Sequence, residues 1–151
     1  MFQIRLFKNL QMIALVITCL TVVGCSNDDP EPIAMVTINN TVLFDNGEDF
    51  TGDIDGDFTG NGGTVARTFV WQNLLSTADY NADITATTDG IFNMVVKDAD
   101  ENVVLNKTLN GAVEPDSFSG VTSSGTTGIW SVTITLTSFD GDGSFSLSEG
   151  N

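Results

Sequence analysis

Strict alternation of apolar and polar residues is the feature that most limits how this chain can fold. In the predicted strand 129–139 every second residue from 130 to 136 is large and apolar, and these residues are Trp130, Val132, Ile134 and Leu136. Serine and threonine fill the positions between them. A period of two places the apolar side chains on one face of a β-strand and the polar side chains on the other. The segment therefore predicts a strand that covers a hydrophobic core with one face.

Shorter runs with the same period recur through the chain. They start near residues 35, 65, 80, 92 and 103, and a weaker run covers 117–121. Turn-forming Asn-Gly and Asp-Gly pairs separate several of these runs. Beyond the first 24 residues, no long segment has apolar residues at helical spacing. The pattern predicts an all-β fold, an antiparallel β-sandwich of the jelly-roll type with seven to nine strands.

Several local predictions complete the expected topology. The Gly- and Asp-rich segment 45–63 carries few apolar residues to bury, so it predicts a loop. The segment 140–143, Asp-Gly-Asp-Gly, predicts a turn that closes a final hairpin, and segments 92–96 and 103–109 predict another hairpin. The first apolar residues of the domain are expected to share one face, namely Val36, Ile38, Val42 and Phe44.

The end of the chain resembles a known group of domains. Residues 128–134, Gly-Ile-Trp-Ser-Val-Thr-Ile, and residues 143–147, Gly-Ser-Phe-Ser-Leu, are similar to the terminal hairpin of bacterial pre-peptidase C-terminal domains and of the related proprotein-convertase P and CUB sandwiches. Residues 92–98 stand where these domains carry a further strand, although Asn93 and Met94 depart from its pattern. The resemblance implies a non-catalytic jelly-roll module and no particular ligand.

The first 24 residues have the three parts of a secretory leader. Arg5 and Lys8 supply the positive start, residues 10–23 are mostly apolar, and the small Gly24 precedes Cys25. A membrane-spanning helix needs about 20 apolar residues, and this run is shorter. A removed signal peptide is therefore favoured over a retained helix.

The segment 20–25, Leu-Thr-Val-Val-Gly-Cys, resembles a bacterial lipobox. The resemblance implies that the leader is removed and that Cys25 receives a covalent lipid such as palmitate. It divides the chain into a signal peptide (1–24), an acidic tether (25–34) and a β-sandwich domain (35–151). The alternative is an ordinary signal peptide with an accidental cysteine. Several acyl chains would hold the protein on a membrane almost permanently, because each buried methylene contributes about 0.8 kcal/mol.

The residues after Cys25 bear on which membrane receives the protein. Ser26 stands where an aspartate would favour retention at the inner membrane. The segment 26–29, Ser-Asn-Asp-Asp, resembles the acidic export tag of surface lipoproteins in Bacteroidetes. This resemblance implies a lipoprotein of the outer membrane that faces the cell exterior. The alternatives are a periplasmic orientation and a tether whose acids only keep it solvated.

The charge balance excludes several partners. Beyond residue 24 the chain keeps three Lys and Arg against 20 Asp and Glu, a formal charge of 3 − 20 = −17. Such a domain is repelled by nucleic acids and by anionic lipid headgroups, so membrane attachment must depend on the lipid. Once Cys19 is removed and Cys25 is acylated, no thiol remains for a disulfide or a thiolate metal site.

The sequence offers few residues for catalysis. It has no histidine, and neither lysine beyond residue 24 follows a glycine-rich phosphate loop. We therefore expect no enzymatic activity. Acidic side chains at alternate positions of a Gly-rich loop can converge on a calcium ion, and the candidate ligands are Asp53, Asp55, Asp57 and Asn61. The alternative is a solvated acidic loop.

Two functions remain open. The anchor, the small size and the missing catalytic residues favour a structural or accessory subunit of an envelope assembly, bound to an envelope protein. The alternative is a cell-surface module that binds calcium or a glycan, with Trp71 and Trp130 as platforms for sugar rings. Alternation with Phe69 and Val132 favours core packing of both tryptophans instead. No cofactor is expected besides the lipid and, in the alternative, calcium.

Overall fold

The computed structural model describes residues 30–86 and 88–150. The predictions for residues 1–29, which include the leader, Cys25 and most of the tether, lie outside this part of the chain. A compact unit extends from Glu31 to the end of the chain, and the side chains of its core lie between Val36 and Leu147. This unit therefore contains its own core. In the described residues no helix is long and apolar enough to cross a membrane.

The described residues form nine β-strands, as the alternation predicts, and no helix. In chain order the strands are β1 (Ala34–Ile38), β2 (Thr41–Val42), β3 (Glu48–Phe50), β4 (Ile54–Asn73), β5 (Ala78–Ala86), β6 (Ile91–Lys97), β7 (Val103–Asn110), β8 (Ser117–Val121) and β9 (Gly128–Glu149).

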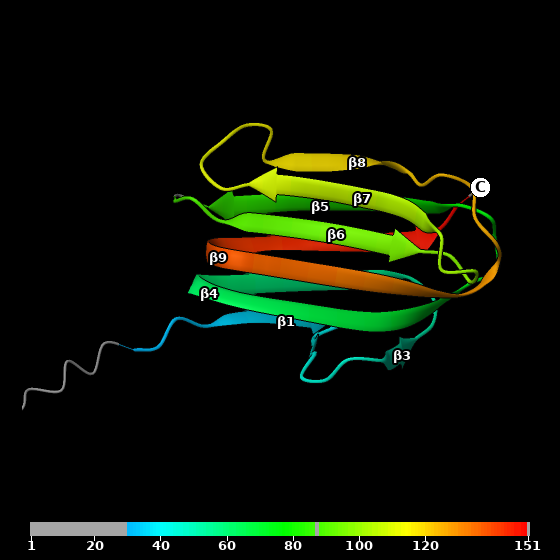
Figure 1. Ribbon diagram of the computed structural model, residues 1–151, viewed down its shortest axis with the longest axis horizontal. Coiled ribbons are helices and arrows are strands. Elements are labelled where there is room, and N and C mark those ends of the chain that lie inside the picture. The colour runs from blue at the N-terminus through cyan, green and yellow to red at the C-terminus, as the bar shows by residue number, and fades with distance from the viewer. Residues whose placement is uncertain (1–29, 87, 151) are drawn as a thin grey trace, which may run out of the picture. The chain divides into compact units, whose positions relative to one another are not determined.

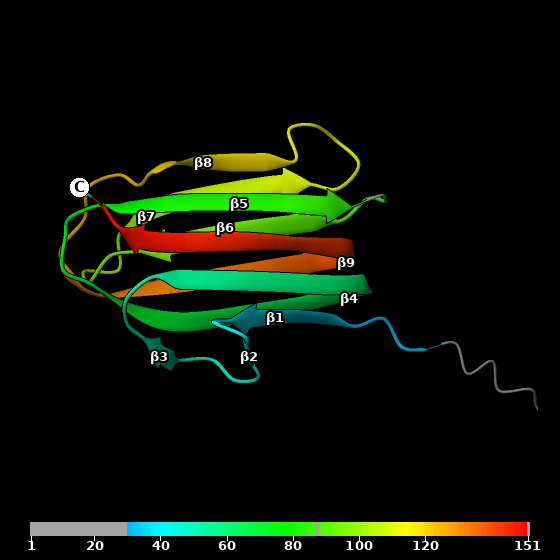
Figure 2. The same cartoon turned by 180° about the vertical axis from the view of Figure 1, so that it is seen from behind.

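Strands β4 and β9 are long, pair with each other along their whole length and belong to two layers (Figure 1). Residues 54–61 of β4 and 140–149 of β9 lie in the first sheet, in the order β2-β1-β4-β9-β5-β8. Residues 63–73 of β4 and 128–139 of β9 lie in the second sheet, in the order β3-β4-β9-β6-β7. Figure 2 shows the first sheet from its outer side.

This arrangement confirms the predicted antiparallel jelly roll. When β4 and β9 are each divided at the crossing, every sheet has four principal strands, β4-β9-β5-β8 in the first and β4-β9-β6-β7 in the second. From β4 to β9 the chain alternates between the two sheets except at the β6–β7 hairpin, as it does in two Greek keys. The short strands β1, β2 and β3 extend the edges, and β3 is the one strand in the described residues that pairs in parallel, with β4.

The β4/β9 pair passes from one sheet to the other where both strands are rich in glycine. The pairing register is irregular around Gly63. Close to this irregularity, Gly141 of β9 pairs with Gly60 of β4. The φ of Gly141 is 146°, a conformation that residues with a side chain rarely adopt. A Cβ atom on Gly141 would also overlap the carbonyl oxygen of Thr85. Glycine is therefore needed here for a change of sheet.

The segment 140–143 is thus not a turn, and the predicted closing hairpin is wrong. Residues 129–139 pair with β4 and β6, whereas residues 143–147 pair with β4 and β5. An Asp-Gly pair suits a tight turn and a crossing strand equally well. The chain crosses between the sheets here because β4 crosses at the same place and pairs with β9 in both sheets. The other predicted hairpin, β6 with β7, is confirmed.

The segment 45–63 is only partly a loop, which corrects a second prediction. Ile54, Gly56 and Phe58 are buried and alternate with exposed Asp55 and Asp57, so the segment from residue 54 onward is strand. Glycine occupies the inward position at residue 56 because the ring of Phe145 lies where its Cβ atom would be. In the sequence this glycine suggests a break in the strand, although it is the small partner of a large core residue.

The start of the domain corrects a third prediction. Asn39 and Asn40 form a tight turn with φ values of 48° and 65°, and this turn sets the register of β2 against β1. Leu43, whose N–H donates to the carbonyl oxygen of Val36, is buried, whereas the side chain of Phe44 is 73% exposed. The predicted common face therefore holds for Val36 and Ile38 but not for Phe44, nor for Val42, which pairs with the outward residue Thr37.

The two tryptophans lie in the core. Trp71 and Trp130 are fully buried, and their rings meet edge to face with centroids 6.2 Å apart. Each indole N–H donates to a backbone carbonyl oxygen at 2.7 Å, that of Gly52 for Trp71 and that of Thr126 for Trp130. The core-packing interpretation is confirmed, and neither ring can serve as a platform for a sugar.

Candidate functional site: a groove across the first sheet

One register row of polar residues crosses the outer face of the first sheet. Its members are direct neighbours on successive strands, in the order Thr37 (β1), Asp57 (β4), Ser144 (β9), Asp83 (β5) and Ser117 (β8). Thr37, Asp57 and Asp83 each lie between two buried residues, and residues that pair directly on neighbouring strands point to the same face, so the row points to the exterior. Five neighbouring strands span about 19 Å at the usual strand spacing.

The row lies at the floor of a groove formed by two adjoining hollows. The hollow over β1, β4, β9 and β5 has a volume of about 430 Å³, and the hollow over β5, β8 and β9 has a volume of about 530 Å³. They share Asp83 and Ser144. The groove therefore runs across the strands from Met35 at one end to Ser119 at the other.

The lining of the groove is rich in hydrogen-bond acceptors and carries no cation. Its carboxylates are Asp57, Asp83 and Asp142, and hydroxyl groups and one amide lie between them. Met35, which is 39% exposed, adds an apolar contact at one end. Carboxylates accept hydrogen bonds, while serine and threonine hydroxyls both donate and accept. The groove can bind a molecule with many hydroxyl groups, and its negative charge disfavours phosphate, sulfate or carboxylate ligands.

The four predicted calcium ligands do not come together. Asp53 precedes β4, while Asp55, Asp57 and Asn61 point outward along this strand. Successive outward residues of a strand lie about 6.6 Å apart, and Asn61 Oδ1 already accepts a hydrogen bond from the backbone N–H of Ile33 at 2.6 Å. In the described part of the chain no three acidic side chains are grouped closely enough to hold a metal ion. The calcium site stays a prediction.

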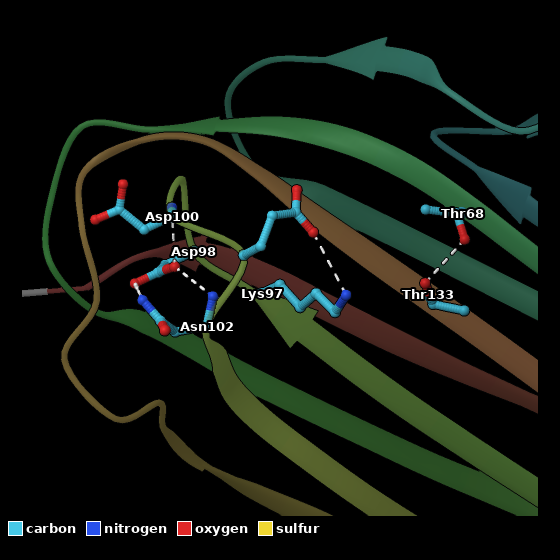
Figure 3. A network of polar contacts seen from close by, with 7 residues as sticks. Thr68, Lys97, Asp98, Asp100, Asn102 and Thr133 are labelled. Atoms are coloured by element: carbon cyan, nitrogen blue, oxygen red, sulfur yellow. Dashed lines mark hydrogen bonds and ion pairs between the residues drawn. The ribbon is translucent and has the colours of Figure 1, made fainter.

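A second polar cluster lies at the β6–β7 turn (Figure 3), and none of its residues lines the groove. Asp98 is 3% exposed and accepts four hydrogen bonds. Three come from the backbone N–H groups of Thr126 at 2.9 Å, Asn102 at 2.8 Å and Asp100 at 3.0 Å, and the fourth comes from the Asn102 amide at 3.3 Å. Asp98 therefore ties the β6–β7 turn to the loop before β9, and its role is structural.

The pH dependence of stability should report this cluster. The N–H of Thr126, above all, lowers the pKa of Asp98 below its usual value of 3.8, although burial acts in the opposite direction. A lowered pKa in the folded state contributes stability that is complete above the unfolded value and is lost as the pH falls through the folded value. The free energy of unfolding of wild type minus that of Asp98→Asn should be constant near neutral pH and shrink below about pH 4.

Urea titrations of both proteins between neutral and acidic pH would measure this difference, because the other carboxyl groups contribute to both proteins. A difference that stays constant down to the lowest pH would contradict the role given to Asp98.

The groove itself could not be recognised in the sequence. Of the four residues that the sequence suggests as calcium ligands, only Asp57 lines the groove. The sequence shows only that polar residues occupy alternate positions in 79–85 and in 142–148, which predicts that they point outward. Which of them become neighbours depends on pairing between residues far apart in the chain, such as Asp57 with Ser144.

Comparisons with known proteins concern the architecture. No protein-family model matches this sequence, and no curated protein matches it significantly. Among solved structures, TmCBM61 in complex with beta-1,4-galactotriose is similar, with 10% identity, a TM-score of 0.40 and coverage of 66% of each chain. The present chain thus spans slightly less than two thirds of that one.

Two further structures are similar at the same level. A chain described as CBM4 has 15% identity and a TM-score of 0.35, and the match covers 64% of this chain and 80% of that chain. A carbohydrate-binding module from the β-sandwich superfamily with promiscuous specificity has 15% identity and a TM-score of 0.34, with coverage of 79% and 52%.

Proposed function

We propose that this domain is a non-catalytic glycan-binding module and that the groove on the first sheet is its binding site. The observation that supports this most directly is the register row from Thr37 to Ser117, which lines one groove with carboxylates and hydroxyls from five strands. A neutral glycan presents hydroxyl groups along its length. Carboxylates accept strong hydrogen bonds from such groups, and the groove contains no cation to attract an anionic glycan.

We further propose that a lipid on Cys25 holds this module on the outer membrane, facing the cell exterior. The lipobox-like segment 20–25 and the acidic segment 26–29 support this location. A tether of about ten extended residues would reach roughly 35 Å, which is enough to keep the domain clear of the headgroups. On this proposal the protein presents glycans to partners on the same surface.

Binding of neutral oligosaccharides to residues 31–151 tests the glycan proposal. A glycan array would find a ligand, and calorimetry with and without calcium would measure its affinity. Asp83 lies in both hollows, so Asp83→Asn should weaken binding by about tenfold or more, since hydrogen bonds to charged groups contribute about 1.5–3 kcal/mol. Asp89→Asn, which removes the same charge from an exposed turn outside the groove, is the matched control.

Equal losses in the two variants would show that only the overall charge matters and would contradict a site in the groove. No binding to any neutral glycan, with or without calcium, would reject the proposed function.

A further inference from the structure

Acidic residues are divided unequally between the two sheets. The strand segments 34–38, 54–61, 78–86, 117–121 and 140–149 of the first sheet contain seven acids and no Lys or Arg. The four main segments of the second sheet, 63–73, 91–97, 103–110 and 128–139, contain no acid at all. They also hold all three cations found beyond residue 24, which are Arg67, Lys97 and Lys107. The part of the chain beyond residue 24, with a formal charge of −17, thus has one sheet whose main strands carry no carboxylate.

The outer face of the second sheet is nearly neutral because Lys97 is the one of these three cations on it and pairs with Glu101 at 3.4 Å. Arg67 and Lys107 pair in register with the buried residues Ile134 and Met94 and so belong to the other face of the sheet, where the Arg67 guanidinium donates to the carbonyl oxygen of Leu43 at 2.7 Å. The nearest acids on the same sheet are Glu48 and Asp49 on the short edge strand β3. The electrostatic repulsion that the carboxylates of this molecule exert on another acidic protein is therefore weakest over this face.

Polar groups on this face bond to one another, which lowers the free energy needed to remove water from them. The hydroxyls of Thr68 and Thr133 lie 2.8 Å apart (Figure 3). The side-chain amide of Asn93 donates to Asn106 Oδ1 at 3.0 Å and to Thr108 Oγ1 at 2.9 Å. Three large apolar residues on the strands of this sheet are also exposed, by 39% at Ile91, 56% at Val103 and 51% at Ile129.

We propose that the outer face of the second sheet binds the same face of a second copy of this chain. Hydroxyl and amide groups both donate and accept hydrogen bonds, so a face made of them is complementary to itself. Four strands of about nine residues cover roughly 20 Å by 30 Å, or about 600 Å² per copy. Two such faces reach the lower limit of specific interfaces, about 1,200 Å² in total, which fits weak and reversible pairing through a two-fold axis.

This pairing leaves both grooves free, because the first sheets then lie on opposite outer sides of the dimer. It does not depend on what the grooves bind. A pair of copies on one membrane would present two grooves, and two linked sites can bind a repeating ligand much more tightly than one.

Salt provides the first test. Two copies of residues 31–151, with a formal charge of 3 − 18 = −15 each, repel one another over about 30 Å at 0.01 M salt and over about 8 Å at 0.15 M salt. Pairing through a neutral face should therefore strengthen as salt is added. Sedimentation equilibrium of residues 31–151 from about 1 μM to about 1 mM should show a monomer–dimer equilibrium whose association constant rises between these salt concentrations.

A matched pair of variants provides the second test. Thr135→Asp places a carboxylate at the centre of the second sheet, between Ala66 and Asn93 on the neighbouring strands. Because like charges across an interface repel strongly, the association constant should fall by about tenfold or more. Thr85→Asp makes the same substitution on β5 of the first sheet and should leave the constant close to that of wild type. Near-ultraviolet circular dichroism of both variants would verify that they are folded.

A monomer at every concentration and at both salt concentrations would overturn the proposal. It would also be overturned by a dimer that weakens with added salt, since that indicates contact between opposite charges, and by equal losses in the two variants. Should Thr135→Asp fail to fold, Thr108→Asp on the exposed edge strand β7 places the charge on the same face and should give the same loss.

Discussion

Replacing Trp130 with alanine is expected to lower the free energy of unfolding by about 3–5 kcal/mol, the usual cost of emptying a large aromatic site in a core. The side chain is fully buried and meets the ring of Trp71 edge to face. The substitution also leaves the carbonyl oxygen of Thr126 without its indole donor at 2.7 Å. Equilibrium unfolding in urea, followed by far-ultraviolet circular dichroism, would measure the change.

Leu74→Ala is the control for this experiment. Leu74 is also large and apolar, but it follows the end of β4 and is 64% exposed. Its truncation should change the free energy of unfolding by no more than about 0.5 kcal/mol. If the two variants lost similar amounts, the inward orientation given to residue 130 would be wrong, and with it the orientation of the whole alternating segment.

Replacing Cys25 with alanine should release nearly all of the protein from the membrane fraction. Two or three acyl chains with about 0.8 kcal/mol per buried methylene make attachment practically irreversible, and a chain with a charge of −17 beyond residue 24 has no other attraction for an anionic surface. Fractionation of cells and metabolic labelling with palmitate would measure attachment and acylation together.

Cys19→Ala is the control, since this cysteine lies in the predicted leader and its loss should change neither labelling nor fractionation. A Cys25→Ala variant that still fractionated with membranes, or a parent protein that took up no label, would contradict the lipid anchor.

The fold class followed from the sequence because it depends on local periodicity. Trp130, Val132 and Ile134 alternate without interruption and are all buried, and no long-range information is needed to recognise such a strand. The same local rule failed at Gly56 and Gly141. One glycine makes room for the ring of Phe145, and the other allows a strand to change sheets. Both roles are set by partners distant in sequence.

The groove was hidden for the same reason. Asp57, Asp83 and Ser144 become neighbours only through the pairing of β4, β5 and β9. The acidic spacing in the sequence grouped Asp57 with Asp53 and Asp55 instead, because alternate positions of a flexible loop can converge on an ion. In an extended strand such positions stay about 6.6 Å apart.

The continuous β4/β9 pair has a consequence for how the domain reaches its folded state. Ile54 pairs with Leu147, and Asn73 pairs with Gly128, so the ladder shared by both layers joins an early part of the domain to its last strand. Neither layer can be completed until the end of the chain is present. A topology dominated by such distant contacts folds slowly, and because the same two strands run through both layers, we expect them to form and to melt in one cooperative transition.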